Sequence, residues 1–290
     1  MEIEHYGDPD KVPPMQTYAI LDAAKIFGLP EMLDTSRLEH RCLFKGDAYD
    51  DLKNVAPWIV RLDEDSDFTA KLFTPGKPPW CMWDKEPGIY IRSRAGLDAL
   101  WKHFRKFIKV QNTNETWYFF RFWENGIIKY YLEISEVNSQ KYIFNDLVYS
   151  FVVRDIFEDM LIIRLIPIAS SASAATIRIT NANLKAFQKL KRARFCRDTM
   201  CWLQKEYPEI ESTQNHRRLI LDEMEFLNAH DPNCDQNSAA YYLAACWLSG
   251  QRLISSEHFT KPGGMTEKRQ YFEALHTKAH KQFWKKQDGS

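Results

Sequence analysis

The chain has 290 residues, of which 44% are hydrophobic and 27% charged, so it has enough apolar material for one large or two modest globular domains and is not a disordered tail. Its 39 basic residues balance its 39 acidic residues, which excludes an overall field that draws the protein to nucleic acid or anionic lipid. The sequence contains neither a membrane-spanning apolar stretch nor a secretory signal, and we expect a cytoplasmic protein without a membrane partner.

Cysteine and aromatic residues give two further expectations. The six cysteines show no paired Cys-x-x-Cys spacing in a chain too large to need disulfide staples, so we expect reduced thiols. Aromatic residues reach 14% of the chain, with nine tryptophans. Most should lie in the core, but Trp and Tyr also anchor protein interfaces, and their excess favours a binding function.

The first ordered segment is predicted to be a buried strand. Residues 1–15 are polar and contain two consecutive prolines, which indicates a loose leader. The apolar run Thr17–Leu21 then predicts a strand. Asp22 follows it and is expected to cap a short helix that runs through Phe27 and ends at Gly28 and Pro30; a catalytic role for this carboxylate is the alternative.

The next segments are short and alternate with loops. Cys42–Phe44 and Pro57–Leu62 are predicted strands, separated by a short helix or turn. The acidic run Asp63–Asp67 lacks the glycine and the glutamate that a calcium-binding EF-hand loop needs, so we interpret it as a solvated loop. Thr74–Trp80 is a rigid, proline-rich connector that forms, with Cys81–Pro87, the longest irregular stretch in the first half of the chain, and loops of this length are often functional or mobile.

A strand, an amphipathic helix and a second strand are predicted between Gly88 and Trp123. Gly88–Ser93 alternates apolar and polar residues, and Ser93 is the expected N-cap of the helix. The helix, Leu97–Lys109, has an apolar stripe and a basic face formed by Lys102, His103, Arg105, Lys106 and Lys109. After a polar turn, Trp117–Trp123 is too aromatic for a surface loop and is predicted to be a strand.

Four motifs in this part of the chain resemble the pattern of the effector-loading chaperones, or adaptors, of bacterial type VI secretion. In chain order they are YAILDAA from Tyr18, LFKG from Leu43 with VAPWIVRL from Val55, GIYIRS from Gly88 with the helix after it, and FFRF from Phe119. The family usually continues FRF with Asp-Pro-Arg, whereas Glu124, Asn125 and Gly126 follow here. The role of that triplet in the family therefore does not transfer to this chain.

The resemblance implies a function. It implies a cytoplasmic chaperone that binds a secreted effector protein and helps to load it onto the VgrG spike, without being secreted itself and without being an enzyme. We expect no cofactor and no metal ion, because the sequence has no glycine-rich phosphate loop, no HExxH and no GxSxG. His230, Asp231 and Cys234 are not followed by a second ligand pair at a useful spacing.

The second half of the chain is predicted to change from strands to helices. Ile127–Ile134 fits both the helical and the strand period, and the resemblance implies a helix. Val148–Val153 and Leu161–Pro167 are predicted to form an antiparallel pair. The small-residue run Ser170–Thr176 then marks a domain boundary between an α/β domain at 16–169 and a helical lobe at 177–290.

Four helices are predicted in the lobe, of which the third is apolar nearly all round and should form its buried centre. The first helix begins at Asn183, and the second, third and fourth span about 216–229, 238–248 and 266–286. The fold class is therefore α/β, with a mixed β-sheet and flanking helices in the N-terminal domain and an all-helical C-terminal lobe.

Two groups of side chains are candidate functional residues. A basic cluster of Arg92, His103, Arg105 and Arg121 could hold a phosphate or carboxylate, or could pair with nearby carboxylates as part of the fold. Candidate partner-binding anchors in an apolar groove are Trp80, Trp83, Trp123, Tyr242 and Trp247, with the core as the alternative location for each.

Two other function classes remain as alternatives to the chaperone. The first is an enzyme that uses His103, Arg105 and Arg121. The second is a nucleic-acid-binding protein that uses the basic helix Lys185–Arg197, although this helix lacks the exposed aromatic residues of a single-strand binder and its basic face also fits simple solvation.

Overall fold

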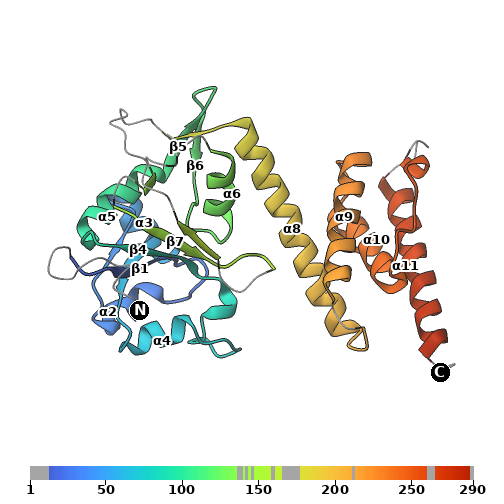
Figure 1. Ribbon diagram of the computed structural model, residues 1–290, viewed down its shortest axis with the longest axis horizontal. Coiled ribbons are helices and arrows are strands. Elements are labelled where there is room, and N and C mark those ends of the chain that lie inside the picture. The colour runs from blue at the N-terminus through green and yellow to red at the C-terminus, as the bar shows by residue number, and fades with distance from the viewer. Residues whose placement is uncertain are drawn as a thin grey trace. The chain divides into compact units, whose positions relative to one another are not determined.

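The computed structural model describes residues 13–135, 140, 143–144, 147–157, 161–164, 177–210, 213–259 and 265–287. Contacts within the chain divide it into two compact units, residues 1–190 and 191–290, which are described separately. The predicted fold class is confirmed, because a unit of strands with flanking helices is followed by a unit whose described elements are helical (Figure 1). No helix among the described residues is long and apolar enough to cross a membrane.

A six-stranded sheet forms the centre of the first unit, and all its strand pairs are antiparallel. In chain order the strands are β1 (Gln16–Asp22), β2 (His40–Cys42), β3 (Pro57–Leu62), β4 (Gly88–Ser93), β7 (Ser150–Val153) and β8 (Leu161–Arg164). Their spatial order is β2-β3-β1-β4-β7-β8, so β1 lies in the interior of the sheet with β3 on one side and β4 on the other. The predicted antiparallel pairing of the last two strands is confirmed.

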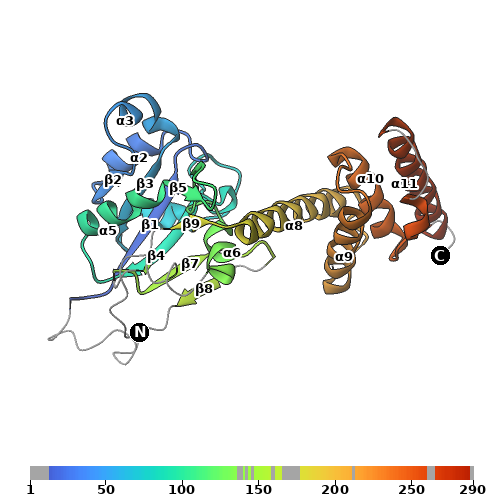
Figure 2. The same cartoon turned by 90° about the horizontal axis from the view of Figure 1, so that it is seen from above.

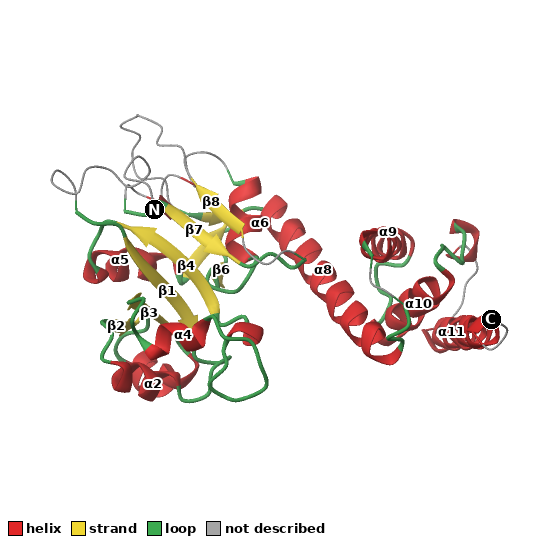
Figure 3. Cartoon of the chain, turned by 60° about the horizontal axis from the view of Figure 1, so that its bottom comes forward, coloured by secondary structure: helices red, strands yellow, loops and turns green. Residues whose placement is uncertain are grey.

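Both faces of this sheet are buried, which explains why β1 is a continuous apolar run. Tyr18 and Ile20 belong to the larger core, whereas Ala19 and Leu21 belong to a second core on the opposite face. The larger core also contains the apolar side of α5 (Leu97–Phe104). The second core contains α2 (Leu29–Ser36) and α4 (Asp67–Leu72), and Figure 3 shows these helices beside the yellow strands.

A second, three-stranded sheet carries the aromatic segment of the sequence. β5 (Lys109–Asn112) and β6 (Trp117–Phe119) form an antiparallel hairpin, and β9 (Arg178–Ile179) runs parallel to β5 on its other side. The hairpin is labelled at the top of the first unit in Figure 1. The ambiguous segment after it is a helix, α6 (Ile127–Ile134), as the resemblance implied.

Two predicted elements are shorter than expected. The helix from Leu97 ends at Phe104 and continues as the 3-10 turn η3 (Arg105–Phe107), because Lys109 already pairs with β6. Its N-cap is Gly96 and not Ser93, whose hydroxyl instead donates to the carbonyl of Leu147.

The predicted strand Trp117–Trp123 ends at Phe119, and the chain then turns. The N–H of Glu124 donates to the carbonyl of Arg121 at 2.9 Å, which closes this turn. Phe120, Phe122 and Trp123 are buried in the larger core, as the aromatic composition suggested.

Smaller differences occur near the N-terminus. No helix follows Asp22; the chain turns, and Gly28 adopts a left-handed φ of 71° directly before α2, so this glycine precedes a helix instead of ending one. The second strand occupies His40–Cys42 and not Cys42–Phe44. The short elements α3 (Asp47–Leu52), η1 (Lys53–Val55) and η2 (Trp83–Lys85) complete this part of the unit.

The second unit is built around α10 (Gln236–Ser249), which lies between α9 (Gln214–His230) and α11 (Met265–Gln287) in Figures 1 and 2. The predicted central position of this helix is confirmed, because its residues from Tyr242 to Trp247 are all buried. Thr213 caps α9 and Asp235 caps α10 through side-chain oxygens that accept backbone N–H groups. A 3-10 turn, η4 (Ser256–Phe259), precedes α11.

The division between the units falls inside the long helix α8 (Asn181–Glu206), between Leu190 and Lys191. Leu184 and Phe187, in its first part, pack against the larger core of the first unit. The predicted boundary run Ser170–Thr176 and most of the predicted leader lie outside the described residues, so the limits 16–169 and 177–290 stay a prediction.

We predict that Phe104→Ala destabilises the first unit by about 3–5 kcal/mol. Phe104 is fully buried, and its ring contacts those of Phe107, Phe122 and Phe151 with centroid separations of 5.5–6.2 Å. Urea unfolding followed by circular dichroism measures the change. The matched control is Phe27→Ala, at a fully exposed phenylalanine, which should change the free energy of unfolding by less than about 0.5 kcal/mol. Equal effects of the two substitutions would contradict the packing described above.

Candidate functional site

The predicted basic cluster is divided among separate partners. Arg92 donates to the hydroxyl of Thr17 on the neighbouring strand. Arg105 donates from Nε to the carbonyl oxygen of Leu43 at 3.1 Å, and its guanidinium lies 4.5 Å from the ring centroid of Trp101. Each contact uses the arginine as a structural donor or as a cation over an aromatic ring.

His103 lies in the core and not on the basic face to which the sequence analysis assigned it. Its side chain is buried and contacts the ring of Phe107 edge-on at a centroid distance of 4.8 Å. Nε2 lies 2.5 Å from the carbonyl oxygen of Ile143, so this nitrogen carries the proton and donates. Burial lowers the pKa of His103, while the hydrogen bond to Ile143 acts in the opposite direction. A neutral, buried imidazole that holds a backbone carbonyl is a structural histidine.

Arg121 forms an ion pair with Asp22, the residue at the end of β1. Nη2 of Arg121 lies 2.5 Å from Oδ2 of Asp22, and Nε lies 3.4 Å from the carboxylate of Glu124. The side chain of Asp22 is 1% exposed, and its second oxygen accepts the N–H of Ala24 at 3.1 Å. Asp22 therefore caps a turn instead of a helix, and its carboxylate joins β1 to the turn after β6. The four residues of the cluster thus have four different partners, which is not the geometry of a shared anion site.

The five predicted aromatic anchors have different degrees of exposure. Trp123, Tyr242 and Trp247 are buried in their respective units, which is the core position that was the alternative for them. Trp80 is 56% exposed. Trp83 is partly buried between Phe73, whose ring centroid is 6.0 Å away, and the guanidinium of Arg154, 5.0 Å from its ring. Only Trp80 and Trp83 of the five keep accessible surface.

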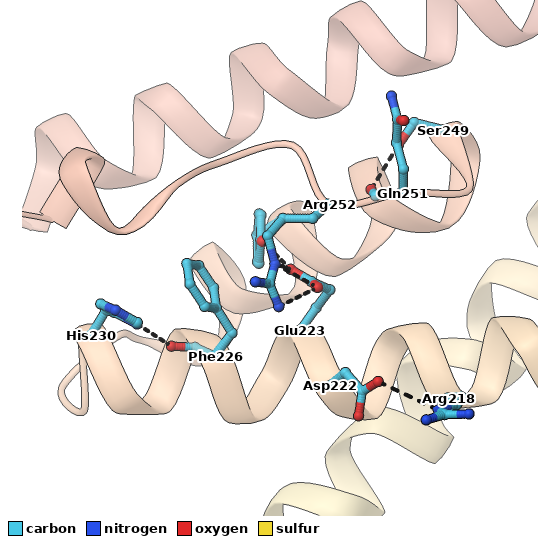
Figure 4. A network of polar contacts seen from close by, with 9 residues as sticks. Arg218, Asp222, Glu223, Phe226, His230, Ser249, Gln251 and Arg252 are labelled. Atoms are coloured by element: carbon cyan, nitrogen blue, oxygen red, sulfur yellow. Dashed lines mark hydrogen bonds and ion pairs between the residues drawn. The ribbon is translucent and has the colours of Figure 1, made fainter.

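Tyr242 belongs to a buried polar network that the sequence did not indicate. Its hydroxyl donates to the carboxylate of Glu223, which also accepts Nε of Arg252 at 2.8 Å (Figure 4). The guanidinium of Arg252 lies 3.9 Å from the ring centroid of Phe226. Glu223 is nearly fully buried, so these donors compensate its loss of water. The network joins α9, α10 and the segment after α10, and we interpret it as structural.

The basic helix face of the nucleic-acid alternative is partly neutralised. Within the second unit, Arg192 lies 3.4 Å from the carboxylate of Glu225, and Arg197 lies 3.1 Å from that of Asp198. Lys185 and Lys189 belong to the other unit, because the division falls after Leu190.

Sequence reasoning missed the exposure of β6. Trp117 is 64% exposed, Tyr118 37% and Phe119 50%, although the whole aromatic segment was predicted to be too aromatic for a surface loop. Its first three residues form an edge strand of a small sheet, whereas Phe120, Phe122 and Trp123 lie in the core. Composition distinguishes these two parts poorly, and a useful signal is the short polar stretch between β5 and β6, which places β6 in a hairpin.

Other sites for small ligands have little support among the described residues. No group of three or more His, Cys, Asp or Glu side chains there is placed to hold a metal ion. All six cysteines are free, and burial raises the pKa of the Cys196 thiol to about 12. A cavity of about 190 Å³ beside Lys129 and Glu133 is smaller than the roughly 300–1,000 Å³ of typical ligand pockets. Lys129 there is paired with Asp155.

Comparison with known proteins gives one match. The model of a family described as a domain of unknown function, DUF4123, matches residues 17–141. No curated protein and no solved structure matches the chain significantly. The matched region includes β1 from its second residue onward, continues to α6, and so includes the exposed hairpin strand β6.

We predict that Arg121→Ala destabilises the protein by about 2–3 kcal/mol, because the buried carboxylate of Asp22 loses its ionic partner. This estimate is below that for a fully buried pair because Arg121 is 39% exposed. The control, Arg61→Ala, removes an ion pair with Glu39 in which both side chains are half exposed, and should cost about 0–1 kcal/mol. Urea unfolding compares them, and equal costs would contradict a structural role specific to Arg121.

We predict that His103 makes the protein less stable as the pH falls below neutrality. The pKa of His103 is lower in the folded protein than in the unfolded chain, so the unfolded chain is protonated first as the pH falls. The free energy of unfolding therefore begins to fall below about pH 6.5 and continues to fall until the pH passes the folded pKa. His103→Gln keeps a donor for the Ile143 carbonyl but cannot titrate. Unfolding free energies between about pH 7.5 and pH 5 should fall less steeply in His103→Gln than in the control His258→Gln, which changes a histidine on the turn before α11. Parallel curves for the two variants would contradict the prediction.

Proposed function

We propose that this protein is a cytoplasmic chaperone or adaptor, which binds a type VI secretion effector and helps to load it onto the VgrG spike without being exported itself. The observation that carries the proposal is the match of residues 17–141 to the DUF4123 family model, over the same region as the four motifs that resemble the effector-loading chaperones. The proposal also holds that the protein is not an enzyme and needs no cofactor.

The accessible surface of the matched region supports a binding function. A chaperone for a secreted toxin must cover apolar surface that the toxin later buries elsewhere, and exposed aromatic side chains suit this task. Trp80 and the three residues of β6 provide such side chains, and all four lie within residues 17–141. Large exposed aromatic residues that gather on one strand indicate an interaction surface more than chance exposure does.

The separation of the basic cluster favours binding over catalysis. His103 is buried and holds a backbone carbonyl, and Arg121 is held by Asp22. Neither is positioned with a second reactive group around a common substrate position, which acid–base catalysis requires. Turnover of a substrate that disappears in a stably folded His103→Ala variant would contradict the non-enzymatic proposal.

The test is co-expression with the effector encoded beside this gene, followed by size-exclusion chromatography. We expect the two proteins to co-elute as a complex, and we expect deletion of this gene to lower both the abundance and the secretion of the effector. An effector from an unrelated gene cluster is the control and should elute separately. The adaptor proposal is wrong if the neighbouring effector never co-elutes and its abundance and secretion do not change on deletion.

A further inference from the structure

β6 is an edge strand, and its hydrogen bonds to β5 show which way its main-chain groups point. The N–H of Phe120 donates to the carbonyl of Ile108 at 2.8 Å, and the N–H of Asn112 donates to the carbonyl of Thr116 at 3.0 Å. In an antiparallel hairpin, residues that bond to the partner strand alternate with residues whose N–H and C=O point away from it. Tyr118 lies two residues from Phe120 and from Thr116, so its main-chain groups point toward β5.

Trp117 and Phe119 therefore direct their N–H and C=O groups toward the outer edge of the small sheet. The strand order β6-β5-β9 places no described strand on that side, and neither residue has a hydrogen-bond partner for these groups among the described residues. Proteins usually protect such edges with charges, prolines or bulges, because an unpaired edge pairs readily with another chain. Here the edge strand carries three exposed aromatic side chains instead.

The side chains beside this edge are apolar and basic. Trp117 and Phe119 share one face of the sheet with Lys109, which is opposite Phe119, and with Arg178 on β9. The ring of Phe119 also contacts Phe44 at a centroid distance of 5.9 Å. Neither Lys109 nor Arg178 has a carboxylate partner among the described residues. Glu115, in the hairpin turn, is an acidic neighbour along the chain.

We propose that the outer edge of β6 binds an extended segment of the effector, rich in aromatic and acidic side chains, which pairs with Trp117 and Phe119 as an added strand. The partner's identity rests on the proposed function, but the chemistry of the segment follows from the surface itself. The outward main-chain groups can pair with a peptide backbone, the exposed rings can pack against apolar side chains, and Lys109 and Arg178 can pair with carboxylates.

Two other occupants fit this surface less well. Single-stranded RNA could stack on the rings and contact the cations, but it would leave the outward main-chain groups of Trp117 and Phe119 without their natural partner, a peptide backbone. A second copy of this chain could pair edge to edge, but it would bring Lys109 and Arg178 to the interface twice. Both alternatives are outcomes of the test below.

The test uses a fluorescein-labelled model peptide of about ten residues, the length of a long strand, in which threonine or valine separates alternating phenylalanine and glutamate. Fluorescence anisotropy measures its binding to the full-length protein. We expect binding that weakens at least about tenfold in Trp117→Ser and in Phe119→Ser, because aromatic anchors dominate such interfaces. Trp202→Ser, which removes an exposed tryptophan on α8, is the matched control and should keep the affinity of the wild type.

A charge exchange tests the acidic specificity. Lys109→Glu together with Arg178→Glu should weaken binding of the glutamate peptide and strengthen binding of a matched peptide in which lysine replaces glutamate. Lys77→Glu, at an exposed lysine of the proline-rich connector, should change neither affinity. If the double variant prefers the glutamate peptide over the lysine peptide as strongly as the wild type does, Lys109 and Arg178 do not bind the acidic side chains, and this part of the proposal is wrong.

Hydrogen exchange tests the added strand directly. The amides of Trp117 and Phe119 should exchange rapidly in the free protein and slowly with the peptide bound, whereas the Tyr118 amide should be protected in both states. Unchanged exchange at Trp117 and Phe119 on a saturated protein would overturn strand addition. Tighter binding of a single-stranded RNA than of the peptide would overturn the choice of partner, and so would a dimer of the free chain that Phe119→Ser dissociates.

The peptide assay uses no effector, so its result is separate from the test of the adaptor function. If the effector co-elutes with wild-type protein and equally with Phe119→Ser, the adaptor function stands and the β6 docking site is wrong. If the model peptide binds as expected, but the neighbouring effector does not co-elute and its abundance and secretion do not change on deletion of this gene, the docking chemistry stands and the adaptor function is wrong.

Discussion

The burial of β1 on both faces and along both edges is the constraint on which the first unit depends. Its side chains enter two cores on opposite faces, and β3 and β4 bond to its two edges. The contact with β4 is so close that a Cβ atom at Gly88 would lie 1.9 Å from the carbonyl oxygen of Ile20, so only glycine fits there. A strand enclosed in this way tolerates neither polar side chains nor a shift of register.

The end of this strand also positions the surface that we propose for binding. Asp22 is the buried last residue of β1, and its carboxylate holds Arg121, two residues after the last residue of β6. That last residue, Phe119, packs against Phe44 and Trp123. The exposed rings therefore stand on a hairpin that is anchored to the rigid sheet, which reduces the conformational entropy lost when a partner binds.

Much of the fold was predictable from the pattern of apolar residues. The apolar run in β1 indicates a buried strand, the alternation in β4 indicates a strand with two different faces, and the nearly uniform apolarity of α10 indicates a central helix. Local pattern was less informative at element ends. The α5 helix stops at Phe104 because the next residues must reach the β5–β6 hairpin, and this pairing involves residues distant enough that helical periodicity does not report it.

The sequence by itself determined several of the strands and helices and which residues are apolar enough for a core, since these depend on neighbours along the chain, but it missed α2 and β5. Only the tertiary structure decided which side chains reach solvent. His103 can be buried because the carbonyl of Ile143, forty residues later, accepts the hydrogen bond from its Nε2–H. Trp123 is buried, whereas Trp117, in the same aromatic run, is exposed. Burial depends on contacts between segments far apart in sequence, and composition cannot distinguish an aromatic ring in the core from one on an open sheet edge.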